Sequence, residues 1–368
     1  MKKVIIISGA NLFSGGTLSI IQDCLQYIDE NLTALYRVIA LVNDKTNFVG
    51  LKNVELIEIP KARNSYFHRL YYEYFKYKSL SRKWRPSLWF SLNDMSSNVF
   101  ADTRAVYCHN PSPFRKITAR DLVDQPKLFF FSLFYKYVYR INIHKNSYVV
   151  VQQKWIKEQF VHCFNLHRKK VIVANPHNSS DITIGDSFRQ EEIKIFFYPA
   201  MARPFKNFEV IIEAVKILER NGVKDFTVVL TISGLENNYA KRIVKQAEGL
   251  NNIKFTGLLD RNEVEEYYKA AVCLLFPSKL ETWGLPITEF KKYNKTIFLA
   301  DLPYAKETLG LYDKAVFFDQ DSGTTLADLM YKIIKGEHIN YSLTCQITYD
   351  SPYSENWKEL FDILLDDK

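Results

Sequence analysis

The stretch KLETWGLPITEF, residues 279–290, places two glutamates on either side of a Gly-Leu-Pro turn. It follows the apolar run VCLLFP, which is typical of a buried strand. Pro286 suits the first turn of a helix, where its missing amide is not needed. Glu281 is therefore expected in a loop after a strand, and Glu289 about one turn into the next helix. Because a carboxylate can accept two hydroxyls, the pair could hold two parts of one elongated ligand, such as a sugar and a ribose.

Two cations follow another predicted strand. The run IKIFFYPA at 193–200 leads into MARPFKNFEV, where Arg203 and Lys206 flank a predicted helix start. Cations at a helix N-terminus oppose the helix dipole, with a penalty of a few tenths to about 1 kcal/mol. A charge-assisted hydrogen bond to phosphate contributes about 1.5–3 kcal/mol and would outweigh that penalty. The pair is therefore either a phosphate site or ordinary solvated surface charge.

Two further candidates lie after strands of the first half. Gly15 and Gly16 open the first predicted helix, where the lack of a Cβ lets a ligand approach the backbone. An ordinary flexible turn is the alternative, since the spacing is not GxGxxG. His109 follows the run AVYC and precedes a loop stiffened by two prolines. An imidazole there can donate to a hydroxyl or polarise one, and the alternative is a turn residue with no chemical role.

Parallel sheets are needed to bring these residues to one edge. Apolar runs typical of strands occur at 4–8, 37–42, 54–59, 88–91, 105–108, 148–152 and 171–174, and again at 193–200, 226–233, 253–257, 272–277, 296–300 and 315–318. Longer amphipathic stretches separate them, which indicates α/β architecture with helices on both faces of each sheet. The polar stretch 175–192 lacks periodicity and is the predicted linker between two doubly wound domains. A last helix is predicted from Ser354, and it needs a surface to pack on.

Length and composition agree with two soluble domains. The 368 residues exceed the usual size of one hydrophobic core, and 47% of them are hydrophobic while 24% are charged. The N-terminal apolar run is too short for a secretory signal, and no run approaches the roughly 20 residues that span a bilayer. Five cysteines without a CxxC pair fit reduced thiols in a cytosolic protein.

Charge is unevenly distributed along the chain. The net charge is +8, but residues 1–184 hold 26 basic against 13 acidic side chains, whereas the remainder holds 23 against 28. A basic half implies an anionic partner, which could be nucleic acid, a membrane surface or a phosphorylated substrate. Segment 62–90 interleaves five tyrosines with lysines and arginines. It is predicted as a surface helix with a tyrosine-rich inner face, with a membrane interface or nucleic-acid stacking as alternatives.

The motif ETWGLPITE resembles the E-x7-E signature of retaining GT-B glycosyltransferases of the GT4 type, the glycosyl transferases group 1. The resemblance extends through HNPSPF, VVVQQKWIKEQF, PAMARPFKNFEVIIEA, TISGLE and DLPYAKETLG, in the order expected of that family. It implies a GT-B fold of two Rossmann-like domains that face a cleft. The acceptor-binding domain would span 1–184 and the nucleotide-sugar-binding domain 185–350, with a C-terminal helix at 351–368 crossing back to the first domain.

The resemblance also implies roles for individual residues. It implies donor binding by Gly15, Gly16, Arg203, Lys206, Gly284, Leu285 and Glu289, and catalytic roles for His109, Glu281, Arg203 and Lys206. Glu289 matches the glutamate that holds the donor ribose, and Glu281 the one beside the anomeric centre. Arg203 and Lys206 match the basic pair on the diphosphate, although their spacing here is short.

Because Arg203, Lys206 and the helix-start amides could stabilise the leaving diphosphate, no catalytic metal or other cofactor is expected. Asp319 and Asp321 nevertheless form a DxD sequence, which binds Mg or Mn in metal-dependent transferases. It follows the run AVFF, lies away from the other candidates in sequence and precedes Ser-Gly. We therefore interpret it as a turn, with a metal site as the alternative. Retention would follow a front-face route, in which the leaving phosphate deprotonates the acceptor, or a double displacement with Glu281 as nucleophile; the first is favoured.

The sequence thus predicts a retaining hexosyltransferase that moves a sugar from a nucleotide sugar to a glycan or lipid-diphosphate-linked acceptor, as in bacterial surface polysaccharide synthesis. A cytoplasmic location is expected, with peripheral attachment to an anionic inner membrane face, and nucleic acid is an unlikely partner. Two alternatives are a nucleotide-sugar epimerase of the same fold and a basic membrane- or nucleic-acid-binding scaffold with an inactive site.

Overall fold

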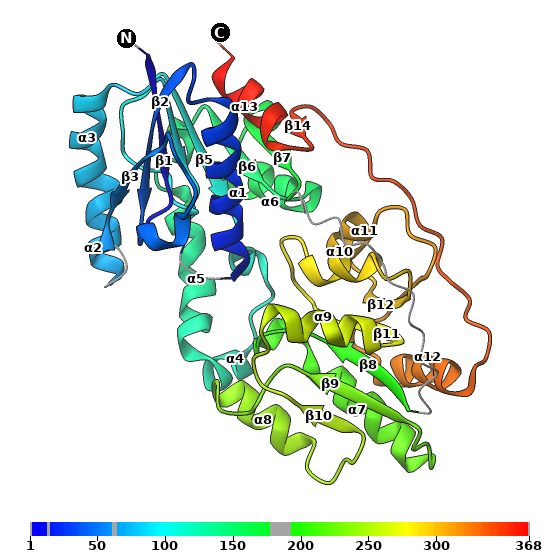
Figure 1. Cartoon of the computed structure of the whole chain (residues 1–368). Helices are drawn as coiled ribbons and strands as arrows, with labels where there is room; N and C mark the ends of the chain where they lie inside the picture. The colour runs from blue at the N-terminus through cyan, green and yellow to red at the C-terminus, as the bar shows by residue number, and fades with distance from the viewer. Residues whose placement is uncertain (1, 13–14, 61–64, 177–192, 367–368) are drawn as a thin grey trace. The chain divides into compact units, whose positions relative to one another are not determined.

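The computed structural model describes residues 2–12, 15–60, 65–176 and 193–366 (Figure 1). The chain divides into two compact units. Unit 1 comprises Met1–Pro113, Phe134–Asn178 and Tyr349–Lys368, and unit 2 comprises Phe114–Leu133 and Ser179–Thr348. Each unit is built around its own parallel sheet, as expected for a doubly wound α/β fold.

The sheet of unit 1 has the strand order β14-β7-β6-β5-β4-β1-β2-β3, and every pairing is parallel. Its strands are β1 (Lys3–Ser8), β2 (Tyr36–Val42), β3 (Glu55–Glu58), β4 (Leu88–Ser91), β5 (Thr103–Cys108), β6 (Tyr148–Val151), β7 (Val171–Ala174) and β14 (Tyr353–Ser354). The helices of this unit are α1 (Gly15–Asn31), α2 (Tyr66–Tyr71), α3 (Tyr77–Trp84), α6 (Lys154–Phe164) and α13 (Trp357–Leu365). Helix α5 (Pro126–Arg140) has residues in both units.

The C-terminal helix completes the core of unit 1. Asn356 caps α13 by accepting a hydrogen bond from the Glu359 amide at 2.9 Å. Leu360, Phe361 and Leu364 are 1% exposed and join the cluster formed by α1 and the central strands. Phe361 stacks on Tyr27 of α1 with ring centroids 5.8 Å apart, and Figure 1 shows α13 beside α1. The helix predicted from Ser354 therefore finds its packing surface, although it begins at Trp357, because Ser354 belongs to β14.

The sheet of unit 2 has the order β10-β9-β8-β11-β12-β13, again wholly parallel. Its strands are β8 (Lys194–Tyr198), β9 (Phe226–Leu230), β10 (Ile253–Phe255), β11 (Cys273–Phe276), β12 (Thr296–Ala300) and β13 (Ala315–Phe318). Its helices are α4 (Ala119–Asp124), α7 (Phe208–Arg220), α8 (Asn238–Gln246), α9 (Arg261–Ala270), α10 (Leu285–Lys291), α11 (Pro303–Leu309) and α12 (Gly323–Lys335). The strand order reverses between β8 and β11, which is where ligands of such sheets bind.

One segment that precedes the predicted domain boundary at residue 184 belongs to unit 2. Phe114–Leu133 clusters with unit 2, although it follows β5 in the chain. Asp124, at the end of α4, accepts hydrogen bonds from the Arg242 guanidinium of α8 at 2.7–3.1 Å, and Arg242 also pairs with Glu209 of α7 at 2.7 Å. Asp124 and Arg242 are 118 residues apart in sequence, so no local pattern reveals their contact. The predicted linker at 175–192 lies almost wholly outside the described residues.

All thirteen predicted strands are confirmed, and β14 is the strand that the sequence reading missed. Segment 62–90 forms α2, a π-helical turn at Tyr72–Lys76, and α3 over its described residues. Its inner face holds buried Tyr77 together with partly buried Tyr72 and Tyr74, whereas Tyr66 and Tyr71 are exposed. The prediction of a tyrosine-rich inner face is therefore right for three of the five tyrosines. No helix in the described part of the chain is both long and apolar enough to cross a bilayer.

Candidate functional site

The loops that leave β8 and β11 are bonded to each other at the point of strand-order reversal in unit 2. The carbonyl oxygen of Phe205 accepts hydrogen bonds from the Lys279 amide at 2.7 Å and the Ser278 hydroxyl at 3.3 Å. Asn207, which precedes α7 in the left-handed conformation, donates its side-chain amide to the Pro277 carbonyl at 3.2 Å. Two strand exits 70 residues apart in sequence thus form one rigid platform at the carboxyl edge of the sheet.

Lys206 and Glu281 meet on this platform. The Lys206 ammonium donates to a carboxylate oxygen of Glu281, and the two side chains are only 15% and 12% exposed. The same ammonium lies 5.9 Å from the ring centroids of Phe205 and Phe276. An ion pair with apolar neighbours is poorly solvated, so each charge depends on the other. The Lys206 ammonium is therefore a candidate for binding an anion, such as a phosphate group.

Arg203 is held from a different direction. It precedes the short 3-10 helix Pro204–Lys206, and its guanidinium donates to Gln125 Oε1 at 3.3 Å. The Gln125 side-chain amide in turn donates to the Ala202 carbonyl at 2.7 Å. Burial lowers the pKa of Arg203 from its usual value, and among the described residues no carboxylate pairs with it. Gln125, which adjoins α4, therefore orients a guanidinium whose charge is not neutralised.

For the nucleotide-sugar donor that the sequence predicts, replacing Gln125 by alanine should raise KM several-fold with little change in kcat, because Arg203 keeps its charge but loses one of its orienting contacts. Steady-state kinetics with the nucleotide-sugar donor measures both constants. Gln246→Ala is the matched control, since that side chain accepts only a long 3.5 Å bond from Arg242. Equal kinetics for wild type and Gln125→Ala would contradict the orienting role.

Glu289 lies one turn into α10, as predicted, but it faces α9. Its two carboxylate oxygens accept hydrogen bonds from the Arg261 guanidinium at 2.8 Å and the Tyr268 hydroxyl at 2.9 Å. Gly284 precedes the helix with φ 89°, a backbone conformation that favours glycine, and a Cβ there would make a tight 3.1 Å contact with Ile287. Leu285 is the first residue of α10. Glu281 and Glu289 thus have different partners, which fits two contacts on one elongated ligand.

Glu289→Ala is expected to weaken donor binding about tenfold, since it removes a carboxylate that could accept the ribose hydroxyls. Calorimetric titration with the nucleoside diphosphate measures the affinity. Tyr268→Phe is the matched control, because it removes one bond to Glu289 and leaves its carboxylate in place. If Glu289→Ala bound the nucleoside diphosphate with unchanged affinity, Glu289 would not belong to the donor site.

His109 lies in unit 1, just after β5 as predicted, and it is 7% exposed. Its Nε2 lies 2.8 Å from the Leu92 carbonyl oxygen, so Nε2 carries the proton there and Nδ1 is left as an acceptor. Nδ1 is buried without a hydrogen-bond partner among the described residues. Burial lowers the pKa of His109, although nearby Asp94 and the Leu92 carbonyl act in the opposite direction. The imidazole is therefore neutral near pH 7 and can accept a hydrogen bond.

This burial predicts a pH dependence of folding stability. The pKa of His109 is lower in the folded than in the unfolded chain, so the unfolded state binds more protons below about pH 6.5. Stability should therefore fall as the pH drops through that range, by at most about 1.4 kcal/mol per pH unit for this one group. Urea unfolding between pH 5 and 7.5 should show a shallower dependence in His109→Gln than in wild type. The same slope in both proteins, with exposed His162→Gln as control, would contradict the assignment.

Asp94 is a residue of this region that sequence reasoning missed. It adopts φ 66°, and its carboxylate accepts hydrogen bonds from the His109 amide at 2.5 Å, the Asn110 amide at 3.2 Å and the Tyr139 hydroxyl at 3.0 Å. It therefore fixes the loop that carries His109. An aspartate shortly after the run LWFS was the available signal, because neighbouring parallel strands end at the same edge.

The remaining candidates are placed as follows. Helix α1 begins at Gly15, so Gly15 and Gly16 open it as predicted, and the residues just before them lie outside the described part of the chain. Asp319 accepts a hydrogen bond from the Asp321 amide at 2.9 Å in the turn between β13 and α12. Asp321 pairs with Lys279 at 2.5 Å, which lowers its pKa. Within the described residues, no group of three or more His, Cys, Asp or Glu side chains could hold a metal ion.

Comparison with known proteins bears on the fold and on the sequence family of unit 2. The sequence model of the family described as Glycosyl transferases group 1 matches residues 180–346, which is unit 2 apart from Phe114–Leu133. Solved structures of low identity share the fold of the whole chain, so the fold class is GT-B, with two Rossmann-like units. The prediction of fold class is confirmed.

Individual relatives are distant in sequence. The O-antigen chain mannosyltransferase RfbU of Salmonella typhimurium is 20% identical over 279 residues, which cover 70% of this chain and 76% of RfbU. The structure of Anabaena HepE in complex with UDP and glucose has a TM-score of 0.65 at 13% identity and covers 90% of each chain. The lipopolysaccharide outer core galactosyltransferase WaaB has a TM-score of 0.61 at 12% identity, covering 91% of this chain and 90% of WaaB.

Proposed function

We propose that this protein is a retaining glycosyltransferase of the GT4 type that moves a hexose from a nucleotide sugar to a glycan or lipid-linked acceptor of a surface polysaccharide. The observation that carries the proposal is the Lys206–Glu281 pair on the platform where the strand order of unit 2 reverses. This position lies within the region that the Glycosyl transferases group 1 model matches. Relatives named for O-antigen and outer core synthesis support the acceptor class.

The donor is proposed to lie along the carboxyl edge of unit 2. Glu289 would accept the ribose hydroxyls, while Lys206 and Arg203 would bind the diphosphate. Complexes of HepE with UDP and with UDP-glucose support a nucleotide-sugar donor on this fold. Because Arg203 has no carboxylate partner among the described residues and Lys206 has one weakly solvated partner, both can form charge-assisted hydrogen bonds to phosphate.

In the reaction, departure of the nucleoside diphosphate would concentrate negative charge on phosphate oxygens. The Lys206 ammonium and the Arg203 guanidinium would stabilise that charge by several kcal/mol without a metal ion or other cofactor. Glu281 would move from Lys206 to the transferred sugar beside the anomeric carbon. A front-face route, with a leaving phosphate oxygen taking the acceptor proton, is proposed because it needs no separate strong base.

The proposed function also includes attachment to a membrane surface. Phe67 and Phe75 are 83% and 69% exposed on the segment formed by α2 and the π-helical turn. Exposed aromatic residues beside lysines and arginines suit the interface of an anionic bilayer. We therefore propose peripheral attachment at the cytoplasmic face, tested by flotation with anionic vesicles before and after Phe67→Ser and Phe75→Ser.

A thermal-shift panel of UDP, GDP, ADP and dTDP with their sugars tests the function. At about 100 times Kd, binding adds about 2.7 kcal/mol and raises the melting temperature measurably. One base should shift the wild type strongly, and an acceptor should then release the nucleoside diphosphate in the presence of chelator. No response to any nucleotide would overturn the enzyme assignment and favour the scaffold alternative. A nucleotide-dependent change of the sugar without transfer would favour the epimerase.

A further inference from the structure

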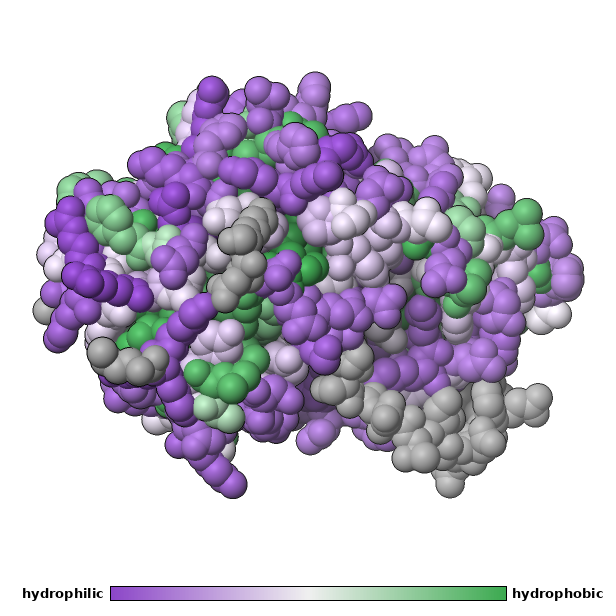
Figure 2. Space-filling view, turned by 90° about the horizontal axis from the view of Figure 1, so that it is seen from above, coloured by the Kyte–Doolittle hydropathy of each residue, from purple (hydrophilic) through white to green (hydrophobic). Residues whose placement is uncertain are grey.

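Several basic residues of the first half lie at the amino edge of the unit 1 sheet. Arg85 precedes β4, Arg104 is the second residue of β5, Lys145 precedes β6, and Lys169 and Lys170 precede β7. Because these strands are parallel neighbours, their starts lie along one edge, opposite the edge that carries His109. In Figure 1 the chain enters β1 at the top, and the face seen from above in Figure 2 is mainly hydrophilic. This edge is therefore distinct from the proposed donor site.

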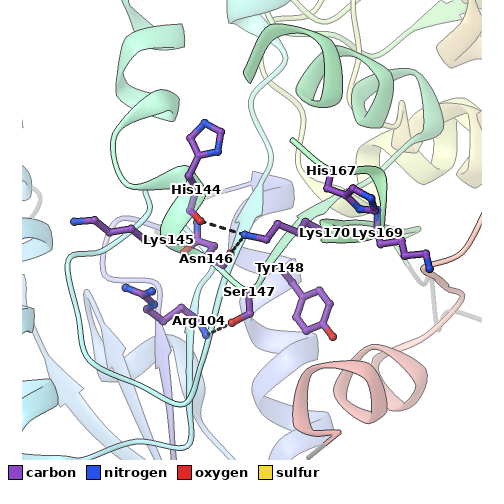
Figure 3. A pocket seen from close by; sticks show the side chains of 9 residues that line it. All are labelled: Arg104, His144, Lys145, Asn146, Ser147, Tyr148, His167, Lys169 and Lys170. Atoms are coloured by element: carbon purple, nitrogen blue, oxygen red, sulfur yellow. Dashed lines mark hydrogen bonds between the residues drawn. The ribbon is translucent and has the colours of Figure 1, made fainter. Parts of the chain in front are cut away.

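A cavity of about 510 Å³ opens at this edge. Its lining includes Arg104, Lys145, Lys169 and Lys170 with two histidines, and none of the described residues that line it is an aspartate or glutamate (Figure 3). In Figure 3 the Lys170 side chain crosses the middle of the group, with Arg104 and Lys145 on one side and Lys169 on the other. Four basic residues thus line one concave surface.

The floor of the cavity is fixed by hydrogen bonds. The Lys170 ammonium donates to the His144 and Asn146 carbonyls at 3.2 and 3.0 Å. The buried Asn146 side chain donates to the Ser96 hydroxyl at 2.7 Å, and the Ser147 amide donates to the Arg104 carbonyl at 2.8 Å. A cavity formed in advance loses little conformational entropy when it binds a ligand.

The charges of the cavity are not neutralised within the described part of the chain. None of its four cations forms an ion pair there, whereas neighbouring Arg168 pairs with Glu158 at 2.5 Å. Lys170 uses two of its three N–H donors on carbonyls, so one remains for a ligand. Burial lowers the pKa of Arg104, and no carboxylate counteracts this effect. A second cavity shares Arg104, and its lining also includes Arg82, Arg85 and the acidic Asp102.

We propose that this cavity binds a phosphate group, at a second anion site separate from the donor platform. An anion there would remove the mutual repulsion of the four cations, and the planar guanidinium of Arg104 can donate to two phosphate oxygens. Lys170 supplies its remaining N–H from the floor, and Lys145 and Lys169 add positive charge to the lining. The phosphate belongs either to a small soluble anion or to a lipid headgroup, and this inference does not rest on the proposed transferase activity.

The test compares two triple variants of the full chain with equal loss of charge. Arg104→Gln, Lys145→Gln and Lys169→Gln remove cations of the cavity, whereas Arg220→Gln, Lys241→Gln and Lys245→Gln remove exposed cations of unit 2. All titrations use inorganic phosphate and pyrophosphate at constant ionic strength, in a Lys206→Ala background that removes the donor phosphate contact. The cavity variant should bind at least tenfold more weakly than the control variant. An equal loss of phosphate and pyrophosphate affinity in both triple variants would overturn the proposal.

Vesicles distinguish the two sources of phosphate. Binding to phosphatidylglycerol vesicles but not to phosphatidylcholine alone, lost only in the cavity variant, would identify a lipid headgroup, whereas binding of inorganic phosphate alone would identify a soluble anion. The proposal would be overturned if the protein bound neither phosphatidylglycerol vesicles nor inorganic phosphate. It would also be overturned if the protein bound only a single-stranded oligonucleotide. Should the cavity variant melt early, the Arg104 Nε–H resonance of the otherwise unaltered protein provides the second measurement. It should shift with phosphate, and an unmoved resonance would again refute the site.

Discussion

Glu281→Gln should lower kcat by about a hundredfold or more and change the donor KM only a few-fold. The amide keeps the shape of the side chain but removes the negative charge that would lie beside the anomeric carbon as positive charge develops there. Glu281 reaches that position from a loop bonded to the β8 exit, so the substitution should not move the platform. Single-turnover kinetics with the donor measures the chemical step directly. Unchanged turnover would exclude Glu281 from the reaction.

The same substitution should also lower the free energy of unfolding, because it breaks the ion pair with Lys206. Removing one partner of a fully buried pair costs about 3–5 kcal/mol, and for this partly exposed pair about 1–3 kcal/mol is expected. A nucleoside diphosphate would give Lys206 a new anionic partner. The melting temperature of free Glu281→Gln should therefore fall, while the increase caused by the nucleotide should exceed that of wild type. A smaller increase would show that the nucleotide does not reach Lys206.

Lys206→Ala should lower kcat/KM for the donor by about a hundredfold. A charge-assisted hydrogen bond to phosphate contributes about 1.5–3 kcal/mol, or roughly 10- to 150-fold, and charge on the leaving group places the loss near the upper limit. Both kcat and donor affinity should fall, because the ammonium would contact the diphosphate in the ground state and more strongly in the transition state.

The control for this prediction is Lys279→Ala on the adjoining loop. Its ammonium pairs with Asp321 at 2.5 Å, but the two side chains are 43% and 63% exposed, and such pairs contribute little. Kinetics close to wild type are expected for Lys279→Ala. If both lysine variants lost activity equally, the effect would reflect the general charge of this edge, and the specific role of Lys206 would be wrong.

The sequence by itself determined the α/β class and the strands that build it. Continuous apolar runs such as those at β8 and β11 are strand signals in their own right, because both faces of a parallel strand are buried. The same local logic placed Glu281 in a loop, Glu289 within a helix and His109 at a strand exit. Chemistry that depends on residues close together in the chain can be predicted in this way.

Only the tertiary structure decided which of those residues meet. Lys206 and Glu281 are 75 residues apart, and Gln125 reaches Arg203 across 78 residues. The basic cavity likewise joins the starts of three strands between Arg104 and Lys170. Such contacts depend on strand order and on the reversal between β8 and β11, which no local pattern encodes. Hydrophobic periodicity specifies what each segment becomes, whereas long-range packing specifies its neighbours.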